Sequence, residues 1–106
     1  MRTKCKGKST VFFADPPRII SGGTIVGDVE AKGLLGSYFD IALEDDTWGE
    51  GTWEKAERKM FEHAVRTALE KGGLTPMQVD ILLGGDLLNQ IISANFAARE
   101  PEIPFL

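Results

Sequence analysis

The sequence predicts a single α/β domain in which parallel strands are layered against helices. Residues 52–73 repeat apolar side chains at helical spacing, and residues 79–85 form a nearly continuous apolar run that suits a strand covered on both faces. A further helix is expected directly after this run. The order strand, long helix, turn, strand, helix is typical of α/β folds with parallel pairing. A chain of 106 residues has room for one domain.

The amino-acid composition excludes several classes of protein. The net charge is −4 and the sequence pI is about 4.9, whereas a nucleic-acid partner would require a basic face. The single cysteine, Cys5, excludes an internal disulfide and a cysteine-based zinc site, and it fits a reducing compartment. The apolar residues 11–14 stop at Asp15, too early for a signal peptide, and no apolar run reaches the roughly eighteen residues of a membrane helix. We therefore expect an intracellular protein with no nucleic-acid partner.

The start of the chain is expected to contain two strands. Residues 1–9 are polar, and we expect them to be frayed. Residues 10–14 and 18–27 are rich in β-branched or aromatic side chains and predict strands, the second interrupted by Gly22 and Gly23. Glycines within a strand mark a bulge or a place where another backbone comes close. Their spacing is not that of a dinucleotide-binding glycine motif, so phosphate binding is disfavoured.

Residues 28–51 are predicted to form one long acidic loop. They have no sustained period, and glycines interrupt them throughout. Such a loop within a compact domain is usually functional or part of an interface. The acidic run Glu44, Asp45 and Asp46 lacks the alternating ligands of a calcium loop. We therefore interpret it as a solvated surface and predict no metal site.

The long helix is the clearest element in the sequence. Thr52 is a suitable N-cap, and Gly72 with Gly73 predicts the end of the helix. His63 lies among charged positions without further ligands at metal-binding spacing, so we predict a surface histidine. A single turn is expected next, because Thr75 and Gln78 form a capping box. The apolar stripe comprises Trp53, Ala56, Met60, Phe61, Ala64, Val65, Ala68 and Leu69.

Polar residues gather where the strand at 79–85 passes into the last helix. Asp86 is placed either to cap this helix or to face a pocket, and both interpretations remain open. Ligands of open α/β sheets collect beyond the carboxyl ends of parallel strands. We predict a helix over 87–98 that is buried on all sides. The predicted ligand-binding or pocket-shaping residues are Gly85, Asp86, Asn89 and Gln90.

Several short stretches resemble one known family. "TWEKAE" at 52–57, "GDLLNQ" at 85–90, "AAR" at 97–99 and "IPFL" at 103–106 occur in the order found in the N-terminal third of the stage V sporulation protein AD family of endospore-forming bacteria. "DPPRII", the Val26-Gly27 pair and "GSYFD" agree as well, and "GDLLNQ" is the most specific of these stretches. One departure is Pro101, which predicts that the last helix ends at Arg99 or Glu100.

The resemblance implies a thiolase-like fold, built from two related α/β halves that each have a mixed sheet packed against helices. Residues 1–106 would be a single partial domain, the first part of the N-terminal half. The resemblance further implies a non-catalytic sporulation protein without a cofactor. Such a protein would bind dipicolinic acid (pyridine-2,6-dicarboxylate), assist its uptake into the developing spore and its release at germination, and lie peripherally at the inner spore (forespore) membrane beside integral membrane proteins of the same operon.

Two further interpretations accompany the resemblance. The alternative function is an acyl-transfer enzyme of the ketoacyl synthase III or thiolase type, and the resemblance implies that its catalytic residues would lie beyond residue 106. Within the chain, Cys5 and His63 do not form a catalytic pair. A homo-oligomer is also expected, since thiolase-like folds dimerise through this helix. The small residues Ser93, Ala94 and Ala97 are predicted to permit close packing at that interface.

Overall fold

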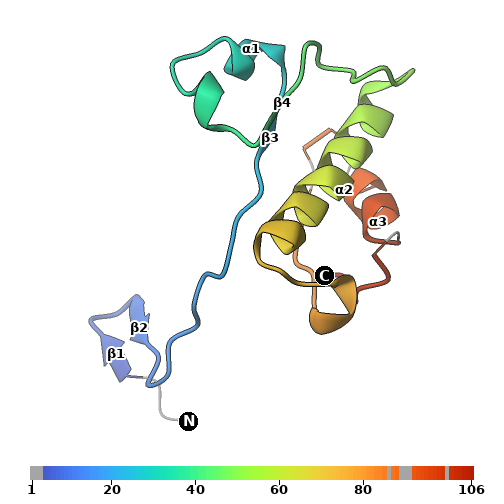
Figure 1. The fold of residues 1–106 in the computed structure, drawn as a ribbon. Coiled ribbons are helices and arrows are strands. Elements are labelled where there is room, and N and C mark those ends of the chain that lie inside the picture. The colour runs from blue at the N-terminus through green and yellow to red at the C-terminus, as the bar shows by residue number, and fades with distance from the viewer. Residues whose placement is uncertain (1–3, 86, 89–91, 100) are drawn as a thin grey trace.

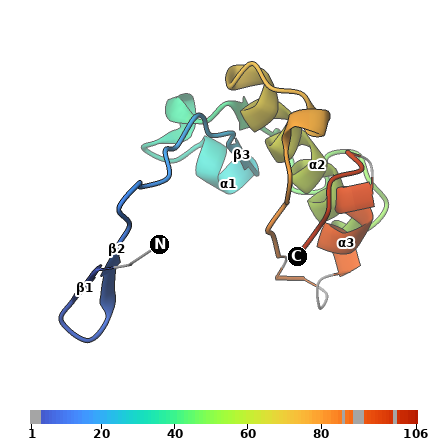
Figure 2. The same ribbon diagram turned by 90° about the horizontal axis from the view of Figure 1, so that it is seen from below.

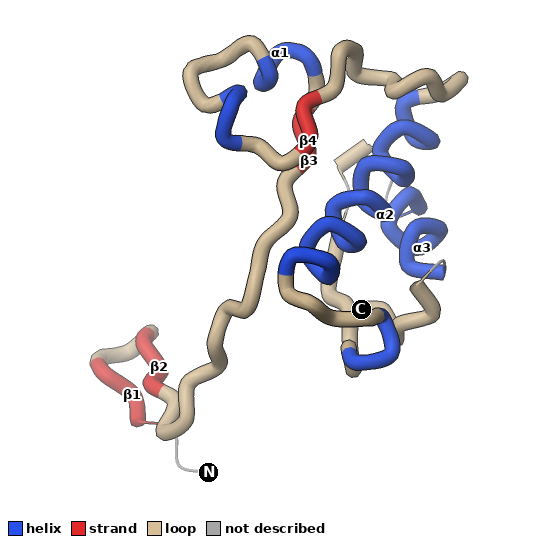
Figure 3. Tube along the Cα trace, viewed as in Figure 1, coloured by secondary structure: helices blue, strands red, loops and turns tan. Residues whose placement is uncertain are grey.

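The computed structural model describes residues 4–85, 87–88, 92–99 and 101–106, and strands and helices are both present within these ranges (Figures 1 and 3). The predicted α/β class is confirmed, because one strand pair is antiparallel, another is parallel, and helices accompany them. The elements in chain order are β1 (Lys4–Lys6), β2 (Thr10–Phe12), β3 (Ile25–Val26), α1 (Asp28–Ala31), the 3-10 turn η1 (Gly36–Tyr38), β4 (Ile41–Ala42), α2 (Trp53–Lys71), the 3-10 turn η2 (Pro76–Gln78) and α3 (Ile92–Arg99).

The chain begins with a projecting arm, which we define as residues 4–20. Its tip is the antiparallel hairpin of β1 and β2, in which Cys5 pairs with Val11 and Gly7 adopts a φ of 73° in the turn. An extended segment then leads to β3, and the hairpin lies apart from α2 and α3 in both views (Figures 1 and 2). The frayed start predicted for residues 1–9 is therefore corrected for residues 4–9, which form the hairpin. Residues 1–3 lie outside the described ranges.

A small lobe follows the arm. β3 and β4 pair in parallel, with Ile25 opposite Ile41 and Val26 opposite Ala42, and α1 and η1 lie between them in the chain. The predicted loop over 28–51 is therefore interrupted by a helical turn, a 3-10 turn and a strand. Elements of two to four residues are too short to produce a sequence period, which is why the pattern predicted a loop.

The bounds predicted for the long helix are confirmed. The Thr52 hydroxyl accepts a hydrogen bond from the Lys55 backbone N–H at 3.2 Å, as expected of an N-cap. At the other end, Gly73 has a φ of 66°, which lets the Leu74 N–H donate to the Leu69 carbonyl at 2.9 Å. No helix in the described part of the chain is long and apolar enough to cross a membrane.

Thr52→Ala is expected to lower the free energy of unfolding by about 1 kcal/mol, because the Lys55 N–H then loses its side-chain acceptor. Urea unfolding followed by the circular dichroism of the helices measures this change. Ser37→Ala, at an exposed position in η1, is the control and should have little effect. Equal unfolding midpoints for Thr52→Ala and the unchanged protein would contradict the capping role.

α3 packs against α2 through its small residues (Figures 1 and 2). Ala94, Ala97 and Ala98 are buried, whereas Asn95 and Phe96 on the same helix are exposed. The prediction of a helix buried on all sides is therefore wrong, since one face is covered and another is open. The helix ends at Arg99, as Pro101 predicts.

The predicted start of the last helix also needs correction. Leu87 and Leu88 lie in a bend outside α3, and their side chains are exposed. Their apolar character resembled that of a buried helix, but no described helical turn includes them. Of the residues predicted to begin the helix, Leu87 and Leu88 are therefore outside it, and α3 is described from Ile92.

The strand predicted at 79–85 forms a short parallel contact with the end of the chain. Leu82 bridges Phe105, the Leu82 N–H donates to the Pro104 carbonyl at 2.7 Å, and the Leu106 N–H donates to the Leu82 carbonyl at 2.8 Å. Gly84 continues the pairing by donating to the Leu106 carbonyl at 3.1 Å. α3 lies between the two paired segments in sequence, so this part of the chain has the order of a parallel βαβ unit.

The segment before β3 contacts α2 through Gly23. A Cβ atom at this glycine would lie 2.5 Å from the Ala64 carbonyl oxygen and 2.7 Å from the Ala68 backbone nitrogen. Nearby, the Ser21 hydroxyl donates to the Ala68 carbonyl at 2.6 Å. The prediction that a glycine in this segment marks a close backbone approach is confirmed for Gly23 but not for Gly22, around which space is open.

Candidate functional site

The predicted pocket residues follow the short strand that pairs with the chain end. Gly85 comes directly after the paired Gly84, is exposed, and has open space where a side chain would be. This is the carboxyl end of a parallel strand, the position that the sequence analysis assigned to it. Asp86, Asn89 and Gln90 lie outside the described residues, so their predicted roles remain predictions.

The end of this strand packs tightly on α2. A Cβ atom at Gly84 would lie 2.8 Å from Cζ of Phe61 and 3.1 Å from Cε2 of Phe105. The two phenylalanine rings meet edge to face, with centroids 6.4 Å apart and an interplanar angle of 82°. Glycine at position 84 therefore allows the strand to lie against this aromatic pair, and the contact positions Gly85, the next residue.

The turn then crosses the N-terminal half of α2. The Leu87 N–H donates to Oε2 of Glu57 at 3.4 Å, while Oε1 of Glu57 is buried without a hydrogen-bond partner among the described residues. Leu88 lines an open cavity of about 600 Å³. Its other lining residues are Ile25, Asp46, Trp53, Glu57, Met60, Phe61 and Ala64. The segment after the strand thus borders a cavity between β3 and α2.

This cavity is mostly apolar, but two of its lining residues are acidic. Asp46 and Glu57 would repel a dianionic ligand placed beside them, and none of the described residues that line the cavity is a lysine or an arginine. Glu57 lies on the same helical face as Trp53, Met60, Phe61 and Ala64, which are four, three, four and seven residues away. The sequence analysis missed Glu57 and Leu88, although a carboxylate within an apolar helical stripe was a usable signal.

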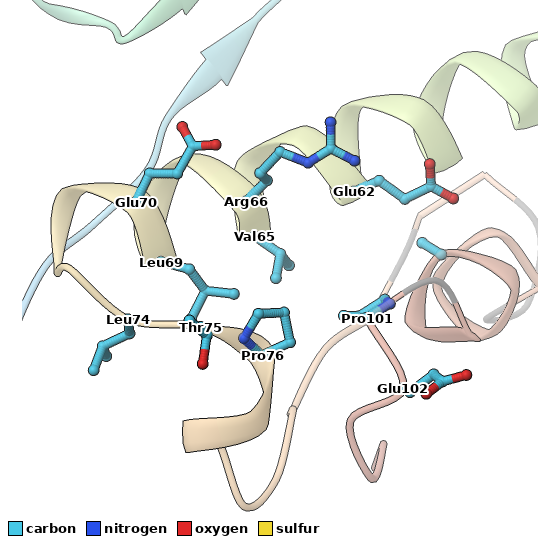
Figure 4. Close-up of a pocket in the computed structure, with 11 residues that line it drawn as sticks. Glu62, Val65, Arg66, Leu69, Glu70, Leu74, Thr75, Pro76, Pro101 and Glu102 are labelled. Carbon is cyan, nitrogen blue, oxygen red and sulfur yellow. The ribbon is translucent and has the colours of Figure 1, made fainter.

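A second, narrower cavity lies at the C-terminal half of α2, and we name it the α2 groove (Figure 4). Its volume is about 350 Å³. The floor is apolar, and the acidic side chains Glu62, Glu70 and Glu102 stand around it together with Arg66. Glu62 also accepts a hydrogen bond from Arg58 at 2.9 Å. The groove is lined by Glu62, Val65, Arg66, Leu69, Glu70, Leu74, Thr75, Pro76, Ala97, Pro101 and Glu102.

Two of the small residues predicted for a dimer interface, Ala94 and Ala97, are buried within the chain. Ala94 and Ala97 are 0% and 1% exposed, and they lie where α3 meets α2 of the same chain. Their small size permits close packing against the chain's own α2, whereas their predicted role at a dimer interface remains a prediction. Ser93 belongs to α3, and its side chain lies outside the described part of the structure.

His63 is half-buried rather than fully exposed as a surface histidine would be. Its ring meets Trp48 edge-on with centroids 4.6 Å apart, and the Lys59 ammonium lies 4.5 Å from the centroid of the same indole. The carboxylate of Asp45 orients Trp48 by accepting hydrogen bonds from the Thr47 hydroxyl and from the backbone N–H groups of Trp48 and Thr47. The same hydrogen bonds, that from the Thr47 hydroxyl first, lower the pKa of the Asp45 carboxyl. The residues that the structure describes contain no cluster able to hold a metal ion.

Asp40 joins the small lobe to the end of α2. Its carboxylate accepts hydrogen bonds from the Lys71 ammonium at 2.9 Å and from the Thr24 backbone and hydroxyl at 2.9 and 3.0 Å. The hydrogen bond from Lys71 is the main cause that holds the pKa of Asp40 below its ordinary value of 3.8, and the bonds from Thr24 add to it. The charged form is therefore the one that the folded chain stabilises.

Asp40→Asn is expected to destabilise the chain at neutral pH and to leave it unchanged in strong acid. Because the folded-state pKa is depressed, the contribution of Asp40 is present above 3.8 and is lost as the pH falls through the folded pKa. The effect should be small, since the carboxylate is exposed and screened by solvent. Urea midpoints of the Asn variant and the unchanged chain, measured at pH 7 and in acid below the lowered folded pKa, check this. An equal loss of stability at both pH values would contradict it.

Together, the parallel strand contacts, the packed helices and the bordering cavities define an α/β protein with a candidate small-molecule site beside α2. A family model described as Stage V sporulation protein AD (SpoVAD) matches residues 7–106. The Stage V sporulation protein AD of Bacillus subtilis (strain 168) is 46% identical over 103 residues, which make up 97% of this chain and 30% of that protein. The chain belongs to the stage V sporulation protein AD family, and it spans less than a third of the length of the curated relative that it matches.

Proposed function

We propose that this protein serves sporulation by binding dipicolinic acid, by assisting its uptake into the developing spore, and by assisting its release at germination. The observation that carries the proposal is the match to the family over residues 7–106, which includes the "GDLLNQ" stretch at 85–90. The proposed role is non-catalytic and needs no cofactor. The proposed role applies to a protein of the full family length. The part that matches this chain makes up 30% of the matched relative.

The site proposed for the ligand lies between Gly85 and the cavity that Leu88 lines. Open space at Gly85 and the contribution of Leu88 to the cavity support this placement. Dipicolinate is a dianion at neutral pH, so it needs cationic groups or N–H donors. Asp46 and Glu57 make the α2 side unsuitable for its carboxylates. We therefore propose that the donors come from the segment 85–90, where Asn89 and Gln90 carry amides, and from polypeptide of the opposite half.

The negative charge of Asp86 means that this residue needs a role other than direct contact with the ligand. A carboxylate does not meet a dianionic ligand directly, because like charges repel. We propose that Asp86 orients a donor such as the Asn89 amide through a hydrogen bond. Asp86 is then a positioning residue, and its removal weakens binding through the donor that it holds.

The exposed apolar surface supports a cleft that is completed by other polypeptide. Leu87, next to the cavity-lining Leu88, is 100% exposed, and an apolar side chain there would gain cover from further polypeptide. In the proposed thiolase-like architecture, the second half of a family-length protein covers such faces and supplies the other wall of the cleft.

We also propose that the protein lies peripherally at the inner spore (forespore) membrane, beside integral membrane proteins of the same operon.

Isothermal titration of dipicolinate into a family-length protein that carries this sequence tests the proposal. We expect saturable binding with one site per chain. Benzoate, a monocarboxylate of similar ring size, is the control ligand and should bind more weakly, because it offers one carboxylate to the donors. A folded protein that gives only heats of dilution with dipicolinate would contradict the proposal.

Mass spectrometry distinguishes this proposal from acyl transfer. An enzyme of the ketoacyl synthase III or thiolase type would retain an acyl group on a cysteine after incubation with an acyl thioester. Cys5 is exposed in the hairpin, whereas His63 lies on α2 and contacts Trp48, so these two residues have separate structural roles. We expect no mass increase on any cysteine, and a stoichiometric acyl adduct would replace the binding proposal by the enzyme.

A further inference from the structure

The N-terminal arm has side chains suited to an interface but makes little use of them within its own chain. Every residue from Cys5 to Ile20 is exposed, including Phe12, Phe13 and Ile19 at 51%, 54% and 96%. The pairing register places Cys5 opposite Val11 on one face of the hairpin and Lys6 opposite Thr10 on the other. An isolated two-stranded hairpin is marginally stable in water, so an apolar partner surface would stabilise it.

Charge is distributed unequally between the arm and the rest of the chain. Residues 1–20 contain five basic residues and one acidic residue, a net charge of +4, and because the whole chain carries −4, residues 21–106 carry −8. The basic residues of this region are Arg2, Lys4, Lys6, Lys8 and Arg18, and the acidic residue is Asp15. The arm is therefore electrostatically complementary to the body of the same protein.

The α2 groove has matching chemistry. Its floor is built from Val65, Leu69, Leu74, Pro76 and Pro101, and Glu62, Glu70 and Glu102 stand around it with Arg66, the one cation among its described lining residues (Figure 4). An apolar floor with an acidic rim suits an extended segment that carries both apolar and basic side chains. The arm is a segment of this kind.

We propose that the arm of one chain docks in the α2 groove of a second copy, with its apolar side chains on the groove floor and its lysines near Glu70 and Glu102. The base of the arm contacts the C-terminal half of α2 through the Ser21 to Ala68 hydrogen bond, on the helix face of Ala64 and Ala68 rather than on the face that lines the groove, so the arm is directed away from its own groove. Pro16 and Pro17 hold the intervening segment extended, away from the chain's own α2 and α3 (Figures 1 and 2). Two arms exchanged about a twofold axis close a dimer.

Charge reversal tests this exchange in the 106-residue chain. Sedimentation equilibrium at low salt is expected to give a dimer for the unchanged chain and a monomer for Lys6→Glu/Lys8→Glu. Glu70→Lys/Glu102→Lys should likewise be monomeric. Mixing the two variants should restore a dimer, because the acidic arm of the first variant then meets the basic groove of the second, and the basic arm of the second meets the acidic groove of the first. Lys32→Glu/Lys55→Glu, which reverses two exposed lysines outside the arm, is the matched control and should leave the dimer intact. Circular dichroism verifies that each variant keeps its helices.

A disulfide test reports the contact directly. Cys5 is the sole cysteine in the chain, and Glu102→Cys places a second thiol at the groove. Mild oxidation is expected to link Cys5 of one chain to position 102 of another, as identified by peptide mapping, whereas Ser37→Cys should not form this link. A monomeric unchanged chain, a dimer insensitive to both charge reversals, or a link from Cys5 to position 102 within a single chain would each overturn the exchange. Charge-dependent binding of the monomeric chain to phosphatidylglycerol vesicles would assign the arm to a membrane surface instead.

Discussion

Replacing Gly23 with alanine is expected to lower the free energy of unfolding by about 1–3 kcal/mol, the range for inserting atoms into a packed contact. The added Cβ atom would lie 2.5 Å from the Ala64 carbonyl oxygen and 2.7 Å from the Ala68 backbone nitrogen. Both are backbone atoms inside α2, so no side-chain rotation relieves the clash. The segment before β3 must then move away from the helix, and the Ser21 to Ala68 hydrogen bond is strained with it.

The neighbouring glycine provides a matched control. Gly22→Ala has the same chemistry, but nothing lies within 4 Å of the added Cβ atom. We expect this variant to be as stable as the unchanged chain or slightly more stable, because alanine reduces the freedom of the unfolded chain. Urea unfolding of both variants measures the difference, and equal midpoints for Gly22→Ala and Gly23→Ala would show that the close approach to α2 does not exist.

Ala94→Leu is expected to be similarly destabilising, by about 1–3 kcal/mol, because three carbon atoms are added at a position with no room for them. Ala94 is 0% exposed in the contact between α2 and α3. The larger side chain must push the two helices apart, and this separation also disturbs the α2 groove, which Ala97 lines. Loss of helical signal at lower temperature in thermal unfolding is the measurement.

Asn95→Leu is the control for this variant, since it introduces the same side chain into the same helix at an exposed position. Leucine is also the better helix former, so a small gain in stability is expected. If both substitutions destabilise equally, the helix contact does not depend on the small residue at 94. If neither does, α3 does not pack against α2 in solution.

Local signals of the sequence predicted several parts of this fold correctly. The bounds of α2 follow from Thr52 and from the two glycines at its end, and both ends are capped by the expected hydrogen bonds. The turn η2 follows from a capping box, in which Gln78 Oε1 accepts from the Thr75 N–H at 2.8 Å. Pro101 marks the end of α3. In each case the residue acts on its immediate neighbours, so the sequence contains the whole cause.

Elements that depend on distant partners were not predictable in this way. β4 is two residues long and exists because Asp40 and Ile41 bond to Thr24, sixteen and seventeen residues earlier. The hairpin of β1 and β2 lies in a stretch whose lysines suggested a frayed end. The exposed side of α3 shows the same limit, since Phe96 is apolar but lies beside the Arg58 and Arg99 guanidinium groups, 5.6 and 4.9 Å from its ring centroid.

The predicted site remains a prediction, because Asp86, Asn89 and Gln90 lie outside the described residues. Leu88, three residues after the exposed Gly85, lines a cavity, and the general rule for parallel strands places ligands in this region. Glu57 and Leu88, however, reach this cavity from α2 and from the bend after the strand, which the packing of Gly84 on Phe61 and the Leu87 to Glu57 hydrogen bond hold near each other. That packing joins residues more than twenty positions apart, which no local pattern records.

We propose that the segment following this strand forms a wall of a dipicolinate site. The most direct test is isothermal titration of dipicolinate into a family-length protein with Asp86→Ala, compared with the unchanged protein and with Asp80→Ala, an exposed aspartate just before the strand. We predict that Asp86→Ala weakens binding about tenfold, which corresponds to about 1.4 kcal/mol, and that Asp80→Ala has no effect. Equal dissociation constants for all three proteins would contradict the claim.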